Sequence, residues 1–115
     1  MTSKTNWDIR ITEVPVGRDI LLLLTGGTAH IGAVATAYFC GKAQEVQVQT
    51  IDLPGHREQE LAAYMAEKAA EALGCTVTVA AGIHYDGINK AQILDIVAEA
   101  KAVFNTYLTK AAKER

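Results

Sequence analysis

A run of five consecutive apolar residues, 20–24, most constrains what this chain can fold into. Turn-forming residues precede it at 15–19, and Gly26 and Gly27 follow it almost at once. A short, unbroken apolar run between turn signals is typical of a buried strand in the interior of a sheet. The sequence therefore predicts a sheet with this segment as a central strand that ends at the two glycines.

Further strands are predicted where apolar and polar side chains alternate. The alternation occurs in residues 7–12, 46–51 and 76–81, and the last of these continues toward Tyr85. Such a period of two indicates a strand with one face buried. Residues 29–39 fit a helical stripe and a strand face about equally well, so the residues alone leave the structure of this segment open.

Two segments have the apolar spacing of helices. The first covers residues 57–73 and ends at Gly74, a natural C-terminal cap. The second follows Asn89, which forms a capping-box pattern with Gln92, and its apolar stripe includes Phe104. We expect this stripe to pack in the core or against another copy. Strands, a helix, one more strand and a final helix indicate an α+β fold, because the alternation is not strictly βαβ.

Composition limits the classes of protein to consider. The chain has 115 residues, half of them hydrophobic, and a formal net charge of −2. This predicts a single globular domain over residues 1–115, without the positive field that binds nucleic acid or an anionic membrane. Neither a signal peptide nor a membrane span is recognisable, so we expect a cytoplasmic protein. Cys40 and Cys75 are expected to be reduced, partly buried thiols, with Cys40 in the core.

All three histidines fall in glycine-containing stretches that interrupt the hydrophobic pattern, at residues 25–32, 53–58 and 82–87. Gly27 and Gly32 have the glycine spacing of a phosphate-binding P-loop. Ala33 and Val34 stand where that motif needs a lysine and a hydroxyl residue, which excludes a P-loop. The glycines of the first stretch then either let the backbone approach a ligand closely or simply form a tight hairpin.

The second stretch places His56 and Arg57 where the first helix should begin. The free N–H groups of a helix start favour an anion, and a guanidinium adds a fork of donors. The alternative is an ordinary turn with Arg57 in solvent.

Nucleophilic catalysis has little support, because the only serine is Ser3 and no G-x-S-x-G pattern is present. Three histidines also raise the question of a zinc site, but no two of them have the spacing that places ligands on one helical face. Neutral histidines can equally hydrogen-bond a heterocycle or an anion.

Together, the stretches TGGTAHIGAVA, LPGHREQEL and AGIHYDGI resemble a known family over residues 20–108. They are similar to the small D-subunit proteins of gallate-type, UbiD-like decarboxylases, which are described as prenylated flavin chaperones. The resemblance implies a fold similar to proteasome-assembly chaperones, with an antiparallel sheet packed by helices, a strand within residues 29–39, and a homodimer. It also implies a non-catalytic protein that binds prenylated FMN and holds it for, or delivers it to, the large decarboxylase subunit.

The same resemblance implies three sides of a flavin site and no catalytic residue. The first side would be lined by Gly26, Gly27, Thr28, His30 and Gly32. His56 and Arg57 would meet the phosphate, and His84 with Tyr85 would close the third side. Two other functions remain open from the residues: a small metal-dependent enzyme using the three histidines, and a purely structural subunit.

Overall fold

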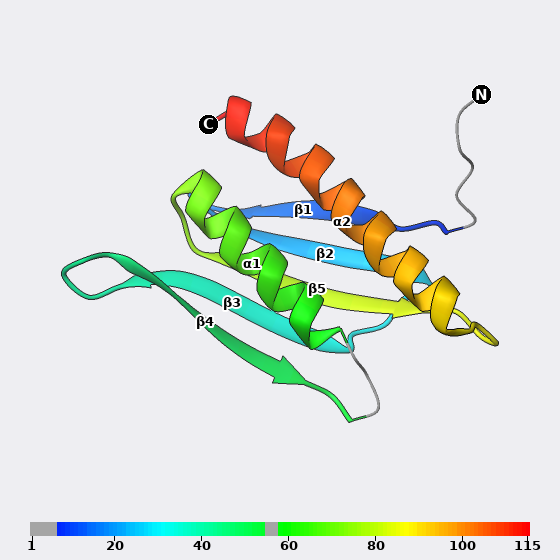
Figure 1. Ribbon diagram of the computed structural model, residues 1–115. Helices are drawn as coiled ribbons and strands as arrows, with labels where there is room; N and C mark the ends of the chain where they lie inside the picture. The colour runs from blue at the N-terminus through cyan, green and yellow to red at the C-terminus, as the bar shows by residue number, and fades with distance from the viewer. Residues whose placement is uncertain (1–6, 55–57) are drawn as a thin grey trace.

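One five-stranded sheet with two helices on one of its faces makes up the fold (Figure 1). The computed structural model describes residues 7–54 and 58–115. The strands are β1 (Arg10–Val16), β2 (Asp19–Gly27), β3 (Ala33–Cys40), β4 (Glu45–Asp52) and β5 (Val77–His84). The helices are α1 (Gln59–Leu73) and α2 (Lys90–Lys113). The expected α+β class, with a sheet packed by two helices, is confirmed.

The strand order, β1-β2-β5-β3-β4, places the last strand of the sequence in the middle of the sheet. β5 is parallel to β2 and antiparallel to β3, and the other neighbouring pairs are antiparallel. The sheet is therefore mixed, with one parallel pair. Because β5 lies between β2 and β3, residues 28–32 must cross the C-terminal end of β5 to connect its two neighbours.

Both ends of the first strand differ from those that the sequence predicts. β1 begins at Arg10 and continues through Pro15, which was expected in a turn. Proline is tolerated there because β1 is an edge strand, and the turn lies at Gly17, where φ is +60°. In the ambiguous segment, residues 33–40 form β3, which agrees with the strand that the resemblance implied.

The helix ends follow the sequence closely. Gly74 is left-handed, with φ +67°, and its N–H donates to the carbonyl of Ala70, as expected of a C-terminal cap. Asn89 and Gln92 form the complete capping box at the start of α2. α1 packs on β3, β4 and β5, whereas α2 packs beside β1 and against α1.

The core lies between the helices and the sheet. Phe104 of α2 and Met65 of α1 are fully buried there against Leu22, Leu24 and Val79. The expectation for Cys40 was wrong, because this thiol is exposed at the end of β3, where the chain leaves the sheet. Cys75 is buried, and burial raises the pKa of its thiol.

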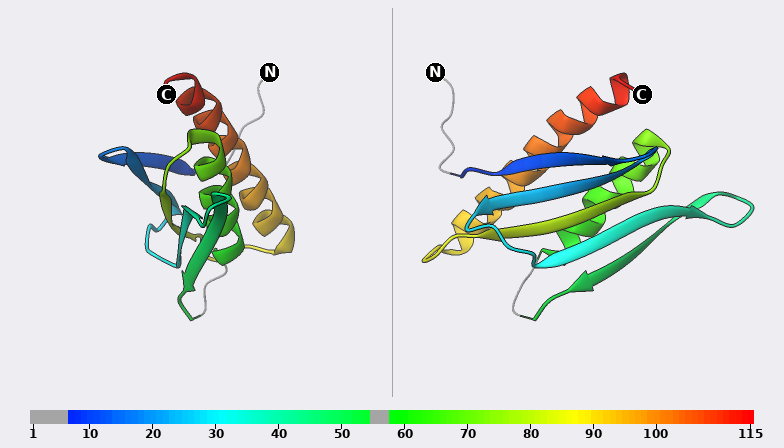
Figure 2. Two further views of the ribbon diagram at one scale, coloured as in Figure 1. Left: turned by 90° about the vertical axis from the view of Figure 1, so that its left-hand side faces the viewer. Right: turned by 180° about the vertical axis from the view of Figure 1, so that it is seen from behind.

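The opposite face of the sheet has no helix over it in the described parts of the chain (Figure 2, right). β2 is an interior strand as predicted, but it is fully buried on one side only. Leu22 and Leu24 face the helices and are buried, whereas Leu21 and Leu23 face the uncovered side and remain half-buried.

Candidate functional site

The predicted site residues that the structure describes gather at one end of the sheet. β2 and β5 are parallel and end side by side, with Gly27 paired to His84 in the register. Both helices also begin at this end (Figure 1). The carboxyl ends of parallel strands are where open sheets with helices commonly bind ligands. The fold therefore unites the first and third glycine-histidine stretches.

The crossing loop, residues 28–32, is held to β5 through backbone hydrogen bonds. The N–H of Thr28 donates to the carbonyl of His84 at 3.0 Å, and the N–H of Gly32 donates to that of Ala81 at 2.8 Å. Between these bonds, the backbone of His30 lies against Gly82, where a Cβ would come within 1.7 Å of the His30 carbonyl oxygen. Glycine at 82 is what permits this close approach.

The glycines assigned to the ligand site also have packing roles. Gly27 has φ +65°, and a Cβ there would lie 2.1 Å from the carbonyl oxygen of His84. A Cβ on Gly26 would meet Ile9 and the hydroxyl of Tyr85, each at 3.1 Å. Both glycines therefore permit a close approach of the end of β2 to its neighbours. Gly27 is exposed, whereas Gly26 is buried.

Glu58 joins three elements of the site, and the sequence reasoning did not single it out. Its carboxylate accepts a 3.0 Å hydrogen bond from the N–H of Ile83 and lies 3.6 Å from Nε2 of His30. Gly32 leaves room for it, since a Cβ at Gly32 would be 2.5 Å from Oε1. Its position just before α1 was a usable signal, because carboxylates are favoured near helix N-termini. The side chain is only 11% exposed.

Two of the three histidines are neighbours in the structure. The rings of His30 and His84 meet edge to face, with centroids 6.1 Å apart. His84 is the more accessible, at 51% exposure against 24% for His30, and its Nε2 lies 2.9 Å from Oδ1 of Asp86. His56 and Arg57, expected at the phosphate, lie outside the described residues.

Tyr85 belongs to a hydrogen-bonded cluster with the start of the described chain. Its hydroxyl donates to Oδ1 of Asp8 at 2.5 Å and accepts from the N–H of Asp8 at 3.0 Å. The same carboxylate oxygen accepts from the N–H of Gly27 at 2.9 Å, and Trp7 packs on the Tyr85 ring with centroids 4.9 Å apart. The hydrogen bonds from Tyr85 and Gly27 lower the pKa of the Asp8 carboxyl. Burial is the larger cause, and the hydrogen bond with Asp8 the smaller one, of the raised pKa of the Tyr85 hydroxyl.

Within residues 7–54 and 58–115, no group of three histidine, cysteine or acidic side chains is arranged to hold a metal ion. His56 is outside these ranges, so the finding concerns His30 and His84 together with the described acids and thiols. Neither helix in the described part of the chain is long and apolar enough to cross a membrane.

Comparison with known proteins connects this geometry to a family. The family model of the prenylated flavin chaperone LpdD-like domain matches residues 3–112. The chain belongs to this family. It is also 31% identical over 93 residues to Protein LpdD of Lactiplantibacillus plantarum, which covers 80% of this chain and 68% of that protein. The resemblance found in the sequence is confirmed, and membership of the LpdD-like family supports a flavin-related accessory role.

Proposed function

We propose that this chain is a non-catalytic accessory protein that binds prenylated FMN and holds it for, or delivers it to, a UbiD-like decarboxylase. Membership of the prenylated flavin chaperone LpdD-like family carries the proposal. The site proposed for the flavin is the end of the sheet where residues 26–32 meet residues 82–85. Its first and third glycine-histidine stretches are adjacent there, as one ligand site would require.

The residue types at this end of the sheet suit such a ligand. A flavin ring presents hydrogen-bond donors and acceptors along one edge, and a neutral imidazole offers one of each. Thr28 and His84 are exposed, and His30 is half-buried behind them. Trp7 and Tyr85 add aromatic surface beside the glycines. These groups would bind and orient the ring.

The phosphate is proposed to bind at the start of α1, through Arg57 and His56. This part of the proposal rests on the sequence, because both residues lie outside the described ranges. One structural feature supports it: among the described residues, the Glu58 side chain does not cap the helix start, because its carboxylate accepts from the N–H of Ile83. Uncapped N–H groups at a helix start favour an anion.

A binding role also agrees with where the thiols lie. Cys40 ends β3 and Cys75 precedes β5, so both are at the end of the sheet opposite the proposed site. Neither thiol could therefore act as a nucleophile at the proposed site, and Ser3 is the single serine of the sequence. We further propose that the chain is one domain, is cytoplasmic, acts as a homodimer and contacts the large decarboxylase subunit directly.

Retention of the cofactor tests the proposal. Wild-type protein mixed with prenylated FMN should keep flavin absorbance through a desalting column, and His84→Ala should bind about tenfold more weakly after loss of a neutral hydrogen bond. Thr106→Ala, an exposed change in the C-terminal half of α2, is the control and should behave as wild type. Failure of the wild type to retain flavin would overturn the proposal.

A second arm tests the orientation of the flavin. Arg57→Ala should weaken the binding of FMN-type ligands ten- to hundredfold, because a charge-assisted hydrogen bond contributes roughly 1.5–3 kcal/mol. The binding of dephosphorylated analogues should stay almost unchanged. Equal weakening of both ligands would show that Arg57 has a structural role instead. The alternative, a small metal-dependent enzyme using His30, His56 and His84, predicts a bound transition metal in protein prepared without chelator, which elemental analysis measures.

A further inference from the structure

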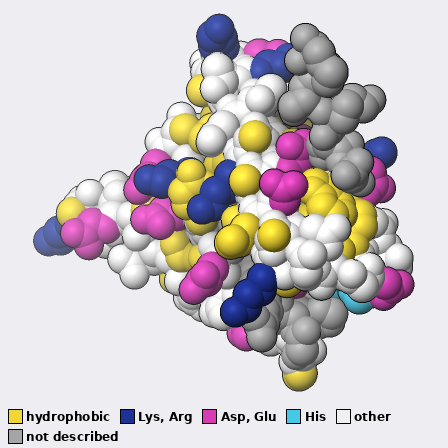
Figure 3. Space-filling model, turned by 45° about the vertical axis from the view of Figure 1, so that its right-hand side comes forward, with side chains coloured by type: hydrophobic (Ala, Val, Ile, Leu, Met, Phe, Trp, Pro, Cys, Tyr) yellow, Lys and Arg dark blue, Asp and Glu magenta, His cyan; other side chains and the backbone are white. Residues whose placement is uncertain are grey.

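Glu58 differs from most other acidic residues of the chain in where its carboxylate lies. Most of these residues are exposed, and on the face shown in Figure 3 they are interspersed with basic side chains. The Glu58 side chain is only 11% exposed and reaches from the start of α1 to the N–H of Ile83 in β5. A carboxylate shielded from water needs neighbours that donate hydrogen bonds, because burying its charge is otherwise costly.

The second group beside this carboxylate is the ring of His30. Oε2 of Glu58, the atom that accepts from Ile83, also lies 3.6 Å from Nε2 of His30. Nε2 is shielded from solvent although the side chain is 24% exposed, so the exposed part of His30 lies elsewhere on the side chain. Because solvent does not reach Nε2, the neighbouring protein groups decide whether this nitrogen carries the proton.

We propose that Glu58 is a positioning residue that keeps the proton of the neutral His30 ring on Nε2 and leaves Nδ1 as an acceptor. An ionised carboxylate only accepts hydrogen bonds, and a neutral imidazole carries its one proton on either nitrogen. With the proton on Nδ1, the lone pair of Nε2 would face the carboxylate oxygen and be repelled by it. With the proton on Nε2, the same contact is attractive, and the partner of one ring nitrogen fixes the state of the other in this way.

The backbone around His30 keeps the ring beside the carboxylate. The crossing loop is hydrogen-bonded to β5 through Thr28 and through Gly32, on either side of His30. Gly32 also leaves room for the carboxylate, because a Cβ there would lie 2.5 Å from Oε1 of Glu58. The ring of His84 meets that of His30 edge to face. These contacts fix the place of the ring, and Glu58 fixes the place of its proton.

This tautomer limits what a ligand can present to His30. A group that meets Nδ1 must donate a hydrogen bond, because this nitrogen then carries a lone pair and no proton. The imide N–H of a flavin ring, which lies between two carbonyl groups, is a donor of this kind. The inference rests on the flavin site proposed above, and it adds which atom of His30 the ligand meets and which residue prepares that atom.

Nitrogen-15 magnetic resonance of the histidine side chains tests the tautomer in the full-length chain without ligand. Protonated and unprotonated ring nitrogens have well-separated signals, and the His30→Gln spectrum identifies those of His30. The neutral ring should carry its proton on Nε2 alone in the wild type, and should become a mixture of both forms in Glu58→Ala. Glu60→Gln is the matched control, since Glu60 is exposed two residues further on, and should leave the tautomer unchanged.

Two outcomes would overturn the proposal: a proton on Nδ1 in the wild type, or an unchanged Nε2–H form in Glu58→Ala. Far-ultraviolet circular dichroism verifies that each variant folds. Should Glu58→Ala fail to fold, Glu58→Met takes its place, because it fills similar space without an acceptor. Glu58→Gln keeps an oxygen that can accept at the same place, so it should keep the wild-type tautomer, as a merely structural role for the charge would not require.

Titration with prenylated FMN tests the consequence for binding. The amide of an asparagine stands near the place of Nδ1, and that of a glutamine near the place of Nε2. His30→Asn keeps an acceptor where the ligand needs it and should bind only about threefold more weakly than the wild type, whereas His30→Gln should bind about tenfold more weakly. Glu58→Ala should resemble His30→Gln, and Glu60→Gln should bind as the wild type does.

The reverse order of the two His30 variants would overturn the inference, because the ligand would then meet Nε2. Failure of the wild type to bind flavin would overturn the proposed function instead. The two failures are distinguishable, because the tautomer is measured without ligand and is decided by the Glu58 variants alone.

Discussion

Replacing Glu58 by alanine should destabilise the end of the sheet that carries the proposed site. The change removes the acceptor for the N–H of Ile83, in a part-buried contact, and the carboxylate 3.6 Å from His30. An unsatisfied buried donor costs about 1–3 kcal/mol, and loss of the neighbouring contact with the His30 ring adds a fraction of that. We expect a loss of about 2–3 kcal/mol in the free energy of unfolding, or roughly 8–12 °C in the thermal midpoint for a domain of this size.

Urea unfolding of three variants separates the contributions. Glu58→Gln keeps an oxygen that can accept from Ile83 and loses only the charge, so it should cost less than about 1 kcal/mol. Glu60→Ala, an exposed acidic residue in the first turn of α1, controls for the helix dipole and should cost about 0.3–1 kcal/mol. If Glu58→Ala unfolds at the same urea midpoint as Glu60→Ala, the carboxylate does not join the loop to β5 and the reasoning is refuted.

Three further outcomes follow from the same contacts. Phe104→Ala should lower the free energy of unfolding by about 3–5 kcal/mol, because the ring is fully buried; an unchanged thermal midpoint would contradict its place in the core. Gly82→Ala should cost about 1–3 kcal/mol and displace the crossing loop, since a Cβ would overlap the His30 carbonyl, and faster amide exchange in residues 28–32 would reveal the displacement. The Asp8 pKa is lowered from 3.8 by its bonds with Tyr85 and Gly27, so its contribution is fully present above pH 3.8 and is lost as pH falls through the folded-state pKa. The stability difference between wild type and Asp8→Asn should therefore shrink below about pH 4, and a difference that stays constant on acidification would show that the carboxylate is not held as described.

Features determined by neighbouring residues could be predicted from the sequence almost to the residue. The capping box at Asn89 and the left-handed cap at Gly74 depend on contacts within one helical turn, and both are confirmed. Cys40 was misplaced because its apolar neighbours suggested a core position, whereas the strand has already left the covered part of the sheet there. Local composition does not tell how far a strand extends beyond its packing partners.

Features that depend on distant residues could not be predicted in this way. Nothing in the hydrophobic pattern says that β5 inserts between β2 and β3, and that insertion is what brings His84 beside Gly27. The contact of Glu58 with Ile83 joins residues 25 positions apart and arises only once α1 has folded back over the sheet. The motifs indicated which residues matter, and the topology decided which of them meet.

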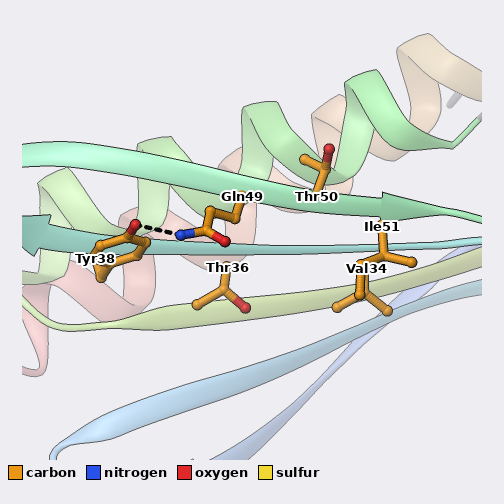
Figure 4. Close-up of a pocket in the computed structure, with 6 residues that line it drawn as sticks. All are labelled: Val34, Thr36, Tyr38, Gln49, Thr50 and Ile51. Carbon is orange, nitrogen blue, oxygen red and sulfur yellow. Dashed lines mark hydrogen bonds between the residues drawn. The ribbon is translucent and has the colours of Figure 1, made fainter.

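Nuclear magnetic resonance titration tests the central claim most directly, because it locates the ligand on the chain. Uniformly ¹⁵N-labelled protein would be titrated with prenylated FMN, and the shift of each amide signal would be followed. The account predicts that the largest shifts fall on residues 26–32 and 82–85, with small shifts in the C-terminal half of α2. Shifts confined to the depression between β3 and β4 (Figure 4), which is lined by Val34, Tyr38, Gln49 and Ile51, or no shifts at saturating ligand, would contradict it.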